Sequence, residues 1–175
     1  MKLFGVKTPK AIFKFKSQIK LNSKPYYMIQ NIYNSQNLLA VIIRSSFREP
    51  GVHFATPNSF SQQLAYMRHP AGKVIAPHVH NSVARQVHFT QEVLLIRSGV
   101  IRVDFYDQSQ NYLESTELVA GDVILLASGG HGFEVIEDLE MIEVKQGPYA
   151  GEMDKTRFIP VNKNNIVLKN NYDTR

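Results

Sequence analysis

The sequence predicts an all-β domain in which short antiparallel strands form a sandwich or a barrel. Runs of β-branched and aromatic residues alternate with Gly, Pro, Asn and Asp at a regular pitch. No long stretch repeats its apolar residues with the 3.6-residue period of a helix. With 175 residues, the chain is long enough for one domain with a sizeable core.

The first 63 residues are expected to form an N-terminal extension whose strands pack on the barrel. Runs of apolar, β-branched or aromatic residues predict strands at residues 11–15, 26–32 and 38–43. The dipeptides Pro50-Gly51 and Pro57-Asn58 indicate a loop over residues 45–59. A short helix at residues 58–67 is an alternative for the end of this region.

Residues 64–147 are expected to hold the barrel core, and residues 148–175 a C-terminal tail. Further strand patterns lie at residues 64–68, 100–106, 112–118, 123–126, 133–136 and 141–145. Ser98-Gly99 predicts a two-residue hairpin turn after the apolar run at residues 93–96. The acidic pair Glu137-Asp138 predicts a second turn, between the last two strands.

The composition restricts the chemistry and the partners. The chain contains no cysteine, which excludes disulfides, thiolate metal sites and a thiol nucleophile. Its net charge is +5, and the excess of lysine and arginine precedes Glu49. We interpret these cations as the polar face of an edge strand rather than as a site for an anionic partner. No apolar run is long enough for a signal peptide or a membrane span, so we expect a cytoplasmic protein without a membrane or nucleic-acid partner.

Two histidines form the centre of the candidate site. His78 and His80 are two residues apart, so on a strand their rings would project from one face, about 7 Å apart along the chain. Glu92 begins an apolar run, and His131 follows a glycine-rich turn. If the strands that carry Glu92 and His131 lie beside the histidine pair, four ligand-capable groups converge. The pattern therefore predicts a mononuclear metal site built on strands.

The spacing of these residues resembles the two motifs of the cupin superfamily over about residues 64–144. Five residues separate Gly72 from His78, and six separate Glu92 from Gly99, as in the first cupin motif. Gly121, Gly129 and His131 resemble the second motif, although His131 comes one residue early, and Ala127 and Val135 stand where the family has proline and asparagine. Eleven residues separate His80 from Glu92, where cupins have three or four. This insertion is expected to form a longer loop or an extra strand at the mouth of the barrel.

The resemblance implies a fold, a cofactor and an assembly. Cupins are jelly-roll barrels with a double-stranded β-helix, so the chain would be a single-domain barrel with an N-terminal strand extension. His78, His80, Glu92 and His131 would hold one divalent metal ion, and this ligand set suits iron, nickel, manganese or zinc. Two coordination positions would stay open for water or substrate. A homodimer is expected, because cupins commonly pair through edge strands.

The implied function is that of a metal-dependent enzyme, of the oxygenase or isomerase type. Its substrate would be a small polar molecule, anionic or sugar-like, bound inside the barrel. His88 would lie about 13 Å from Glu92 along one strand, too far to bind the same ion, so we place it at the rim as a proton carrier. Tyr106 is a second candidate catalytic residue. The candidate substrate-binding residues are Arg68, Gln86, Gln91 and Arg97.

Two other functions agree with the same residues. A metal-free sugar-nucleotide ketoisomerase or epimerase would use His78 or His80 as the base, assisted by Tyr106 or His131. A non-enzymatic module would bind a metal ion or a small ligand in the barrel. Glu92 distinguishes the metal-dependent enzyme from the metal-free isomerase or epimerase, because a carboxylate that points at two histidines is most useful as a metal ligand.

Overall fold

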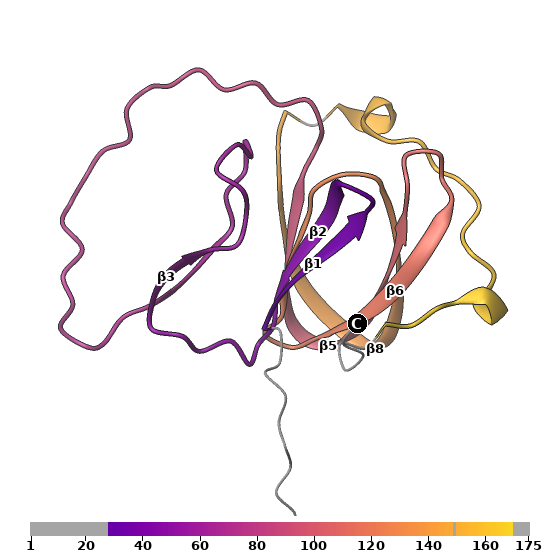
Figure 1. Cartoon of the computed structure of the whole chain (residues 1–175), viewed down its shortest axis with the longest axis horizontal. Coiled ribbons are helices and arrows are strands. Elements are labelled where there is room, and N and C mark those ends of the chain that lie inside the picture. The colour runs from indigo at the N-terminus through magenta and orange to yellow at the C-terminus, as the bar shows by residue number, and fades with distance from the viewer. Residues whose placement is uncertain (1–27, 149, 170–175) are drawn as a thin grey trace, which may run out of the picture.

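The computed structural model describes residues 28–148 and 150–169, and the regular structure of these residues is almost entirely β-strand (Figure 1). The strand expected at residues 11–15 lies outside the described residues. The strands are β1 (Ile29–Asn34), β2 (Asn37–Ile43), β3 (Gly51–Phe54), β4 (Ala65–Arg68), β5 (Glu92–Tyr106), β6 (Tyr112–Val119), β7 (Val123–Leu126) and β8 (Gly130–Lys145). Two short 3-10 helices follow, η1 (Gly151–Asp154) and η2 (Lys163–Asn165). The all-β prediction is confirmed, and residues 58–67, proposed as a short helix, form turns and bends that lead into β4.

Six of the strands form one antiparallel sheet around β5, in the order β1-β2-β7-β5-β6 with β8 also paired to β5. β8 follows one edge of β5 along most of its length, whereas β7 and β6 share the other edge. The sheet curls into a half-barrel, which Figure 1 shows end on. β1 and β2, from the predicted N-terminal extension, are joined to this sheet through β7.

A bulge in β5 replaces the hairpin turn predicted at Ser98-Gly99, so that prediction is wrong. β5 and β8 run on as continuous strands, and their register shifts between Ile96 and Ile101. The fully buried side chains change from even to odd positions across the bulge, from Leu94 and Ile96 to Ile101. An extra residue in one strand has this effect, because strand side chains alternate between faces. The turn predicted at Glu137-Asp138 is wrong for the same reason.

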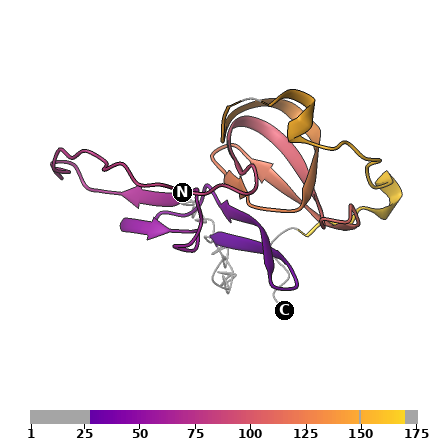
Figure 2. The same ribbon diagram turned by 90° about the horizontal axis from the view of Figure 1, so that it is seen from above.

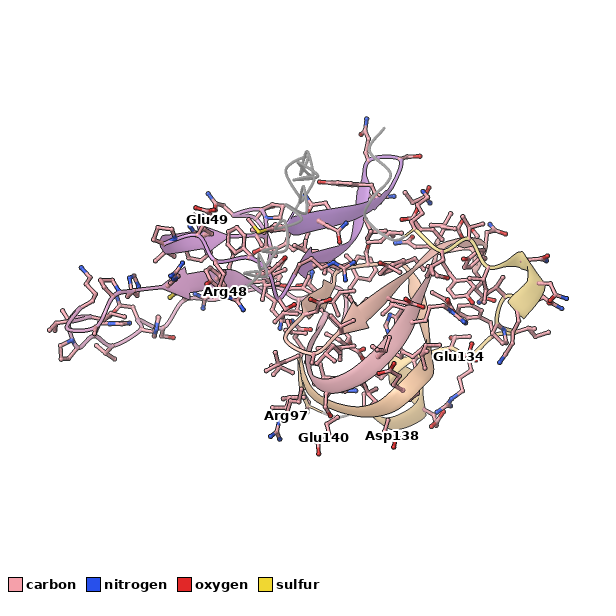
Figure 3. The ribbon with its side chains drawn as sticks, turned by 90° about the horizontal axis from the view of Figure 1, so that it is seen from below. Arg48, Glu49, Arg97, Glu134, Asp138 and Glu140 are labelled. Carbon is pink, nitrogen blue, oxygen red and sulfur yellow. The ribbon has the colours of Figure 1, made fainter. Side chains whose placement is uncertain are left out.

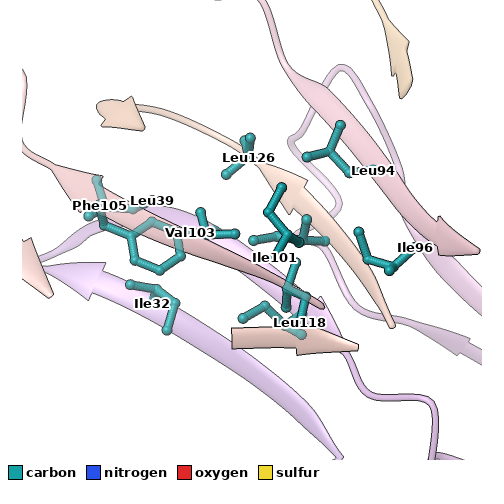
Figure 4. Close-up of a cluster of buried hydrophobic side chains, with 12 residues drawn as sticks. Ile32, Leu39, Leu94, Ile96, Ile101, Val103, Phe105, Leu118 and Leu126 are labelled. Atoms are coloured by element: carbon teal, nitrogen blue, oxygen red, sulfur yellow. The ribbon is translucent and has the colours of Figure 1, made fainter. Parts of the chain in front are cut away.

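The core lies on the inner face of the curled sheet (Figure 4). Residues directly opposite each other in antiparallel strands share a face, so the registers place apolar side chains of β2, β7 and β5 in common rows. One such row is Ile42, Ile124 and Leu94, which are each fully buried. The remaining members of the core are Ile32, Leu39, Ala40, Ile96, Ile101, Val103, Phe105, Leu118 and Leu126.

A buried ion pair ties the end of β2 to the start of β7. Asp122 is 1% exposed and accepts hydrogen bonds from the backbone N–H groups of Ser45 and Val119. Its second oxygen also lies 2.7 Å from a guanidinium nitrogen of Arg44, which in turn donates to the carbonyl of Glu117. Buried charges are tolerated only when they are paired and hydrogen-bonded in this way. The Gly-Asp dipeptide before β7 is therefore a structural corner.

β3 and β4 form a separate two-stranded ribbon, which we call the arm (residues 51–68). Figure 2 shows the arm projecting from the half-barrel. Its His53 and Tyr66 rings contact Phe47, which is buried at the base of the arm. β4 was expected in the barrel core, but its strand partner is β3. Among the described residues, no helix reaches the length and apolar character that crossing a bilayer requires.

Candidate functional site

A carboxylate and an imidazole meet at one end of the half-barrel. Oε2 of Glu92 lies 3.2 Å from Nε2 of His131, and both side chains are largely shielded, at 15% and 29% exposure. Glu92 is the first residue of β5 and lies on the inner face, two residues before the fully buried Leu94. His131 pairs with the buried Phe105 and therefore shares that inner face.

The contact depends on the curl of the sheet. Glu92 and His131 belong to opposite ends of the β5–β8 ribbon, because Glu92 pairs with Lys145 at the far end of β8. An untwisted ribbon of this length would hold the two side chains tens of ångströms apart, at about 3.3 Å per residue. The bulge around Gly99 bends both strands, and the two ends of the ribbon approach each other as a result.

Positive charge lies beside this pair. Nζ of Lys145 is 3.9 Å from Oε1 of Glu92 and 3.1 Å from Oε1 of Glu143. The hydrogen bond from His131 is the main cause that lowers the pKa of Glu92, burial opposes it, and the charges of His131, Lys145 and Lys155 add to the lowering. The hydrogen bond with Glu143 is the main cause that raises the pKa of Lys145. Glu92 is therefore held as a carboxylate.

The histidine pair lies elsewhere in the structure. His78 and His80 belong to an exposed stretch without regular structure, residues 69–90, which forms a wide loop beside the barrel (Figure 1). The strand expected for them is not formed, although their rings do contact each other at 5.2 Å between centroids. Among residues 28–148 and 150–169, no three His, Asp or Glu side chains are arranged to hold a metal ion. The structure thus brings Glu92 and His131 together, and the four-ligand site stays a prediction.

The other predicted site residues are dispersed. Gln86 and His88 lie in the same exposed stretch as the histidine pair. Arg68, at the end of β4, donates to the carbonyl of Arg48. Arg97 is 61% exposed beside Glu140 and lies on the outer face of β5, between the inward-facing Ile96 and the bulge.

Tyr106 and Gln91 are both buried. The Tyr106 hydroxyl accepts a hydrogen bond of 3.0 Å from the backbone N–H of Val161, and its ring contacts Phe158. Gln91 donates from Nε2 to the carbonyl of Ala127 at 3.4 Å, while its Oε1 has no hydrogen-bond partner. Tyr106 therefore contacts the C-terminal segment, and Gln91 is hydrogen-bonded to the residue that follows β7.

Lys145 was not among the predicted site residues. The last strand pattern, residues 141–145, indicates only which residues share a face with Lys145, because alternate residues of a strand point the same way. The pairing of β8 with β5 decides that this face is the one that carries Glu92, and pairing between distant strands is not visible in a single sequence. In comparisons with protein-family models, curated proteins and solved structures, nothing matches the chain.

Proposed function

We propose that this protein is a cupin-like metal-binding enzyme that acts on a small polar molecule at the inner face of the half-barrel. The observation that carries the proposal is the contact between Glu92 and His131. Two donor atoms that bind one ion at about 2.0–2.2 Å lie about 2.9–3.5 Å apart, depending on the coordination geometry. The 3.2 Å between Oε2 and Nε2 falls within this range.

The donor set restricts the ion. Imidazole nitrogens with a single carboxylate suit iron, nickel, manganese or zinc. Glu92 and His131 would supply two of the ligands, and His78 and His80 would supply the other two. Such an ion, when bound, supplies Lewis-acid polarisation of a substrate oxygen or a water molecule of lowered pKa. Glu92 is already a carboxylate, so it needs no deprotonation before it binds a cation.

Lys145 indicates the class of substrate. Its ammonium group lies on the inner face beside Glu92, where a carboxylate or phosphate oxygen of a substrate would meet it. Glu143 holds this ammonium in place at 3.1 Å. An anionic or sugar-like small molecule is therefore the substrate class that we propose.

The same contact supports a second candidate, a metal-free acid–base enzyme of the sugar-nucleotide isomerase or epimerase type. A carboxylate that accepts a hydrogen bond from an imidazole orients the ring. His131 would then exchange protons with the substrate, and Glu92 would be its positioning residue.

Metal content distinguishes the two candidates. Protein purified without a histidine tag or chelator should contain about one iron, nickel, manganese or zinc ion per chain, measured by plasma mass spectrometry. Glu92→Gln should lose most of this metal because an amide is a poorer ligand, whereas the control Glu143→Gln should retain it. Full metal content in Glu92→Gln would contradict the ligand assignment. Metal-free wild-type protein after anaerobic reconstitution would favour the acid–base enzyme.

A further inference from the structure

The outer edge of β8 has no strand partner among the described residues. β8 spans Gly130–Lys145 and pairs only with β5 there, so its second edge presents a long row of backbone donors and acceptors. Apolar side chains accompany this edge: Val135 is 57% exposed, and Ile142 and Val144 are 47% and 56% exposed. A long, apolar and unprotected edge is a template for another strand.

The arm has a matching apolar face. Val52 pairs with Met67, and Phe54 pairs with Ala65, so these side chains share one face of the β3–β4 ribbon. Val52, Phe54 and Met67 are all exposed, whereas the opposite face of the arm packs on Phe47. A two-stranded ribbon on its own is marginally stable in water, and it gains stability when a further strand covers it.

The stretch that follows the arm is also apolar and exposed. Residues 69–90 are all exposed, and they include large apolar side chains that a folded protein usually covers. These side chains are Val74, Ile75, Val79, Val83, Val87 and Phe89. Their exposure indicates that this stretch has a docking surface that residues 28–148 and 150–169 of one copy do not supply.

The charge of residues 50–91 is complementary to that of β8. From residue 50 to residue 91 the chain contains no Asp or Glu, and its cations there are Arg68, Lys73 and Arg85. β8, in contrast, is acidic, and its carboxylates are Glu134, Glu137, Asp138, Glu140 and Glu143. Opposite charges favour docking of the end of the arm and the residues that follow it, with Arg68 and Lys73, on the acidic strand.

The arm of a chain is directed away from its own β8. The ring contacts of His53 and Tyr66 with Phe47 fix the base of the arm, and Figures 1 and 2 show it leaving the half-barrel. Figure 3 shows Asp138 and Glu140 at the rim of the half-barrel, apart from Arg48 and Glu49 beside the arm. The free edge of β8 is therefore accessible to a second copy of the chain.

We propose that two copies exchange their arms, so that β4 and residues 69–80 of each copy dock along β8 of the other. Twofold symmetry makes the exchange reciprocal and closed. His131 is on β8, so docking along this strand would bring His78 and His80 of one copy to the Glu92–His131 pair of the other. Each metal site would then consist of two ligands from each chain. This last step rests on the proposed metal-binding function.

Complementation between two inactive variants tests the shared site. One variant carries His78→Ala and His80→Ala, the other Glu92→Gln and His131→Asn, and each alone should lose its metal. When the two are co-expressed with different tags, the purified heterodimer should contain about half the metal of the wild-type dimer, because one of its two sites has all four ligands. A heterodimer without metal would show that the ligands must come from one chain, and would overturn the shared site.

Cross-linking tests the arm exchange without any metal. The chain has no cysteine, so a Met67→Cys chain can be mixed with an Ile142→Cys or a Val144→Cys chain and oxidised. The expected result is a disulfide between chains that forms about tenfold faster than with Val119→Cys, an exposed position on β6, because a disulfide needs Cα atoms within about 7 Å. The exchange would be overturned if disulfides formed at equal rates with Ile142→Cys, Val144→Cys and Val119→Cys. A monomeric wild-type protein in analytical ultracentrifugation would also overturn it. Metal-free but cross-linked dimers would contradict only the proposed function.

Discussion

Gly99 of β5 lies directly against the backbone of Asp138 in β8. A Cβ atom at position 99 would lie 2.0 Å from the carbonyl oxygen of Asp138, and the φ angle of Gly99 is +81°, in the region that favours glycine. No other residue type satisfies both conditions without moving one of the two strands. The bulge that bends the β5–β8 ribbon therefore requires glycine at this position.

We predict that Gly99→Ala destabilises the fold by about 2–4 kcal/mol, through backbone strain and the contact with Asp138. Chemical denaturation measures the change. Gly132→Ala, also in the β5–β8 ribbon, is the control, because a Cβ there would meet its nearest atom at an ordinary 3.7 Å. If Gly99→Ala lowers the free energy of unfolding by no more than Gly132→Ala does, the structural role of the bulge is contradicted.

Asp122→Asn should be the most destabilising single charge removal in the described part of the chain. It leaves the guanidinium of Arg44 without its buried carboxylate, and breaking a buried pair of this kind costs about 3–5 kcal/mol. Glu140→Gln is the control, because its pair with Arg97 is exposed and 3.9 Å long, and such pairs contribute about 0–1 kcal/mol. Thermal unfolding of the two variants should separate them clearly, and similar midpoints would refute the prediction.

Glu134 should make stability depend on pH. Hydrogen bonds from Lys163 and then from Arg102 lower its pKa below the usual 4.5 in the folded state. A carboxyl group with a lowered folded pKa contributes stability that is complete above about pH 4.5 and is lost as the pH falls through the folded value. The stability difference between wild type and Glu134→Gln should therefore shrink below pH 4.5. The exposed Glu49 provides the control, Glu49→Gln, and an unchanged difference at low pH would contradict this account.

Tyr106→Phe should affect the C-terminal segment and leave the proposed metal content unchanged. The variant loses the hydrogen bond from Val161, at a cost of about 1 kcal/mol, while the ring contact with Phe158 remains. Hydrogen exchange at residues 158–169 should become faster. If metal content falls in step with the exchange rate, Tyr106 has a role at the site as well as in packing.

Much of the sheet could be predicted from the sequence, because its short strands are bounded by local breakers. The patterns at residues 38–43, 112–118 and 123–126 correspond to β2, β6 and β7 within one residue. The long strands β5 and β8 were each divided by a predicted turn. Ser98-Gly99 is typical of a hairpin, but the change from even to odd buried positions across it indicates a bulge.

The candidate site could be predicted only in part. Glu92 and His131 were expected to meet, and they lie 3.2 Å apart. Residues 69–91, with His78 and His80, have an apolar pattern that suits a strand, but a strand forms only where another strand pairs with it. Propensity does not specify that partner, and this is why the position of the histidine pair could not be derived from its spacing.

The curl of the β5–β8 ribbon has a mechanical consequence for the Glu92–His131 pair. The two donors sit at opposite tips of one bent ribbon whose curvature is set at the bulge near Gly99. A small change of angle there is amplified over the distance to each tip, so flexing of the scaffold changes the distance between the Glu92 and His131 side chains. Ligand affinity and the stiffness of this ribbon should therefore vary together among variants, even when the substitutions lie far from the donors.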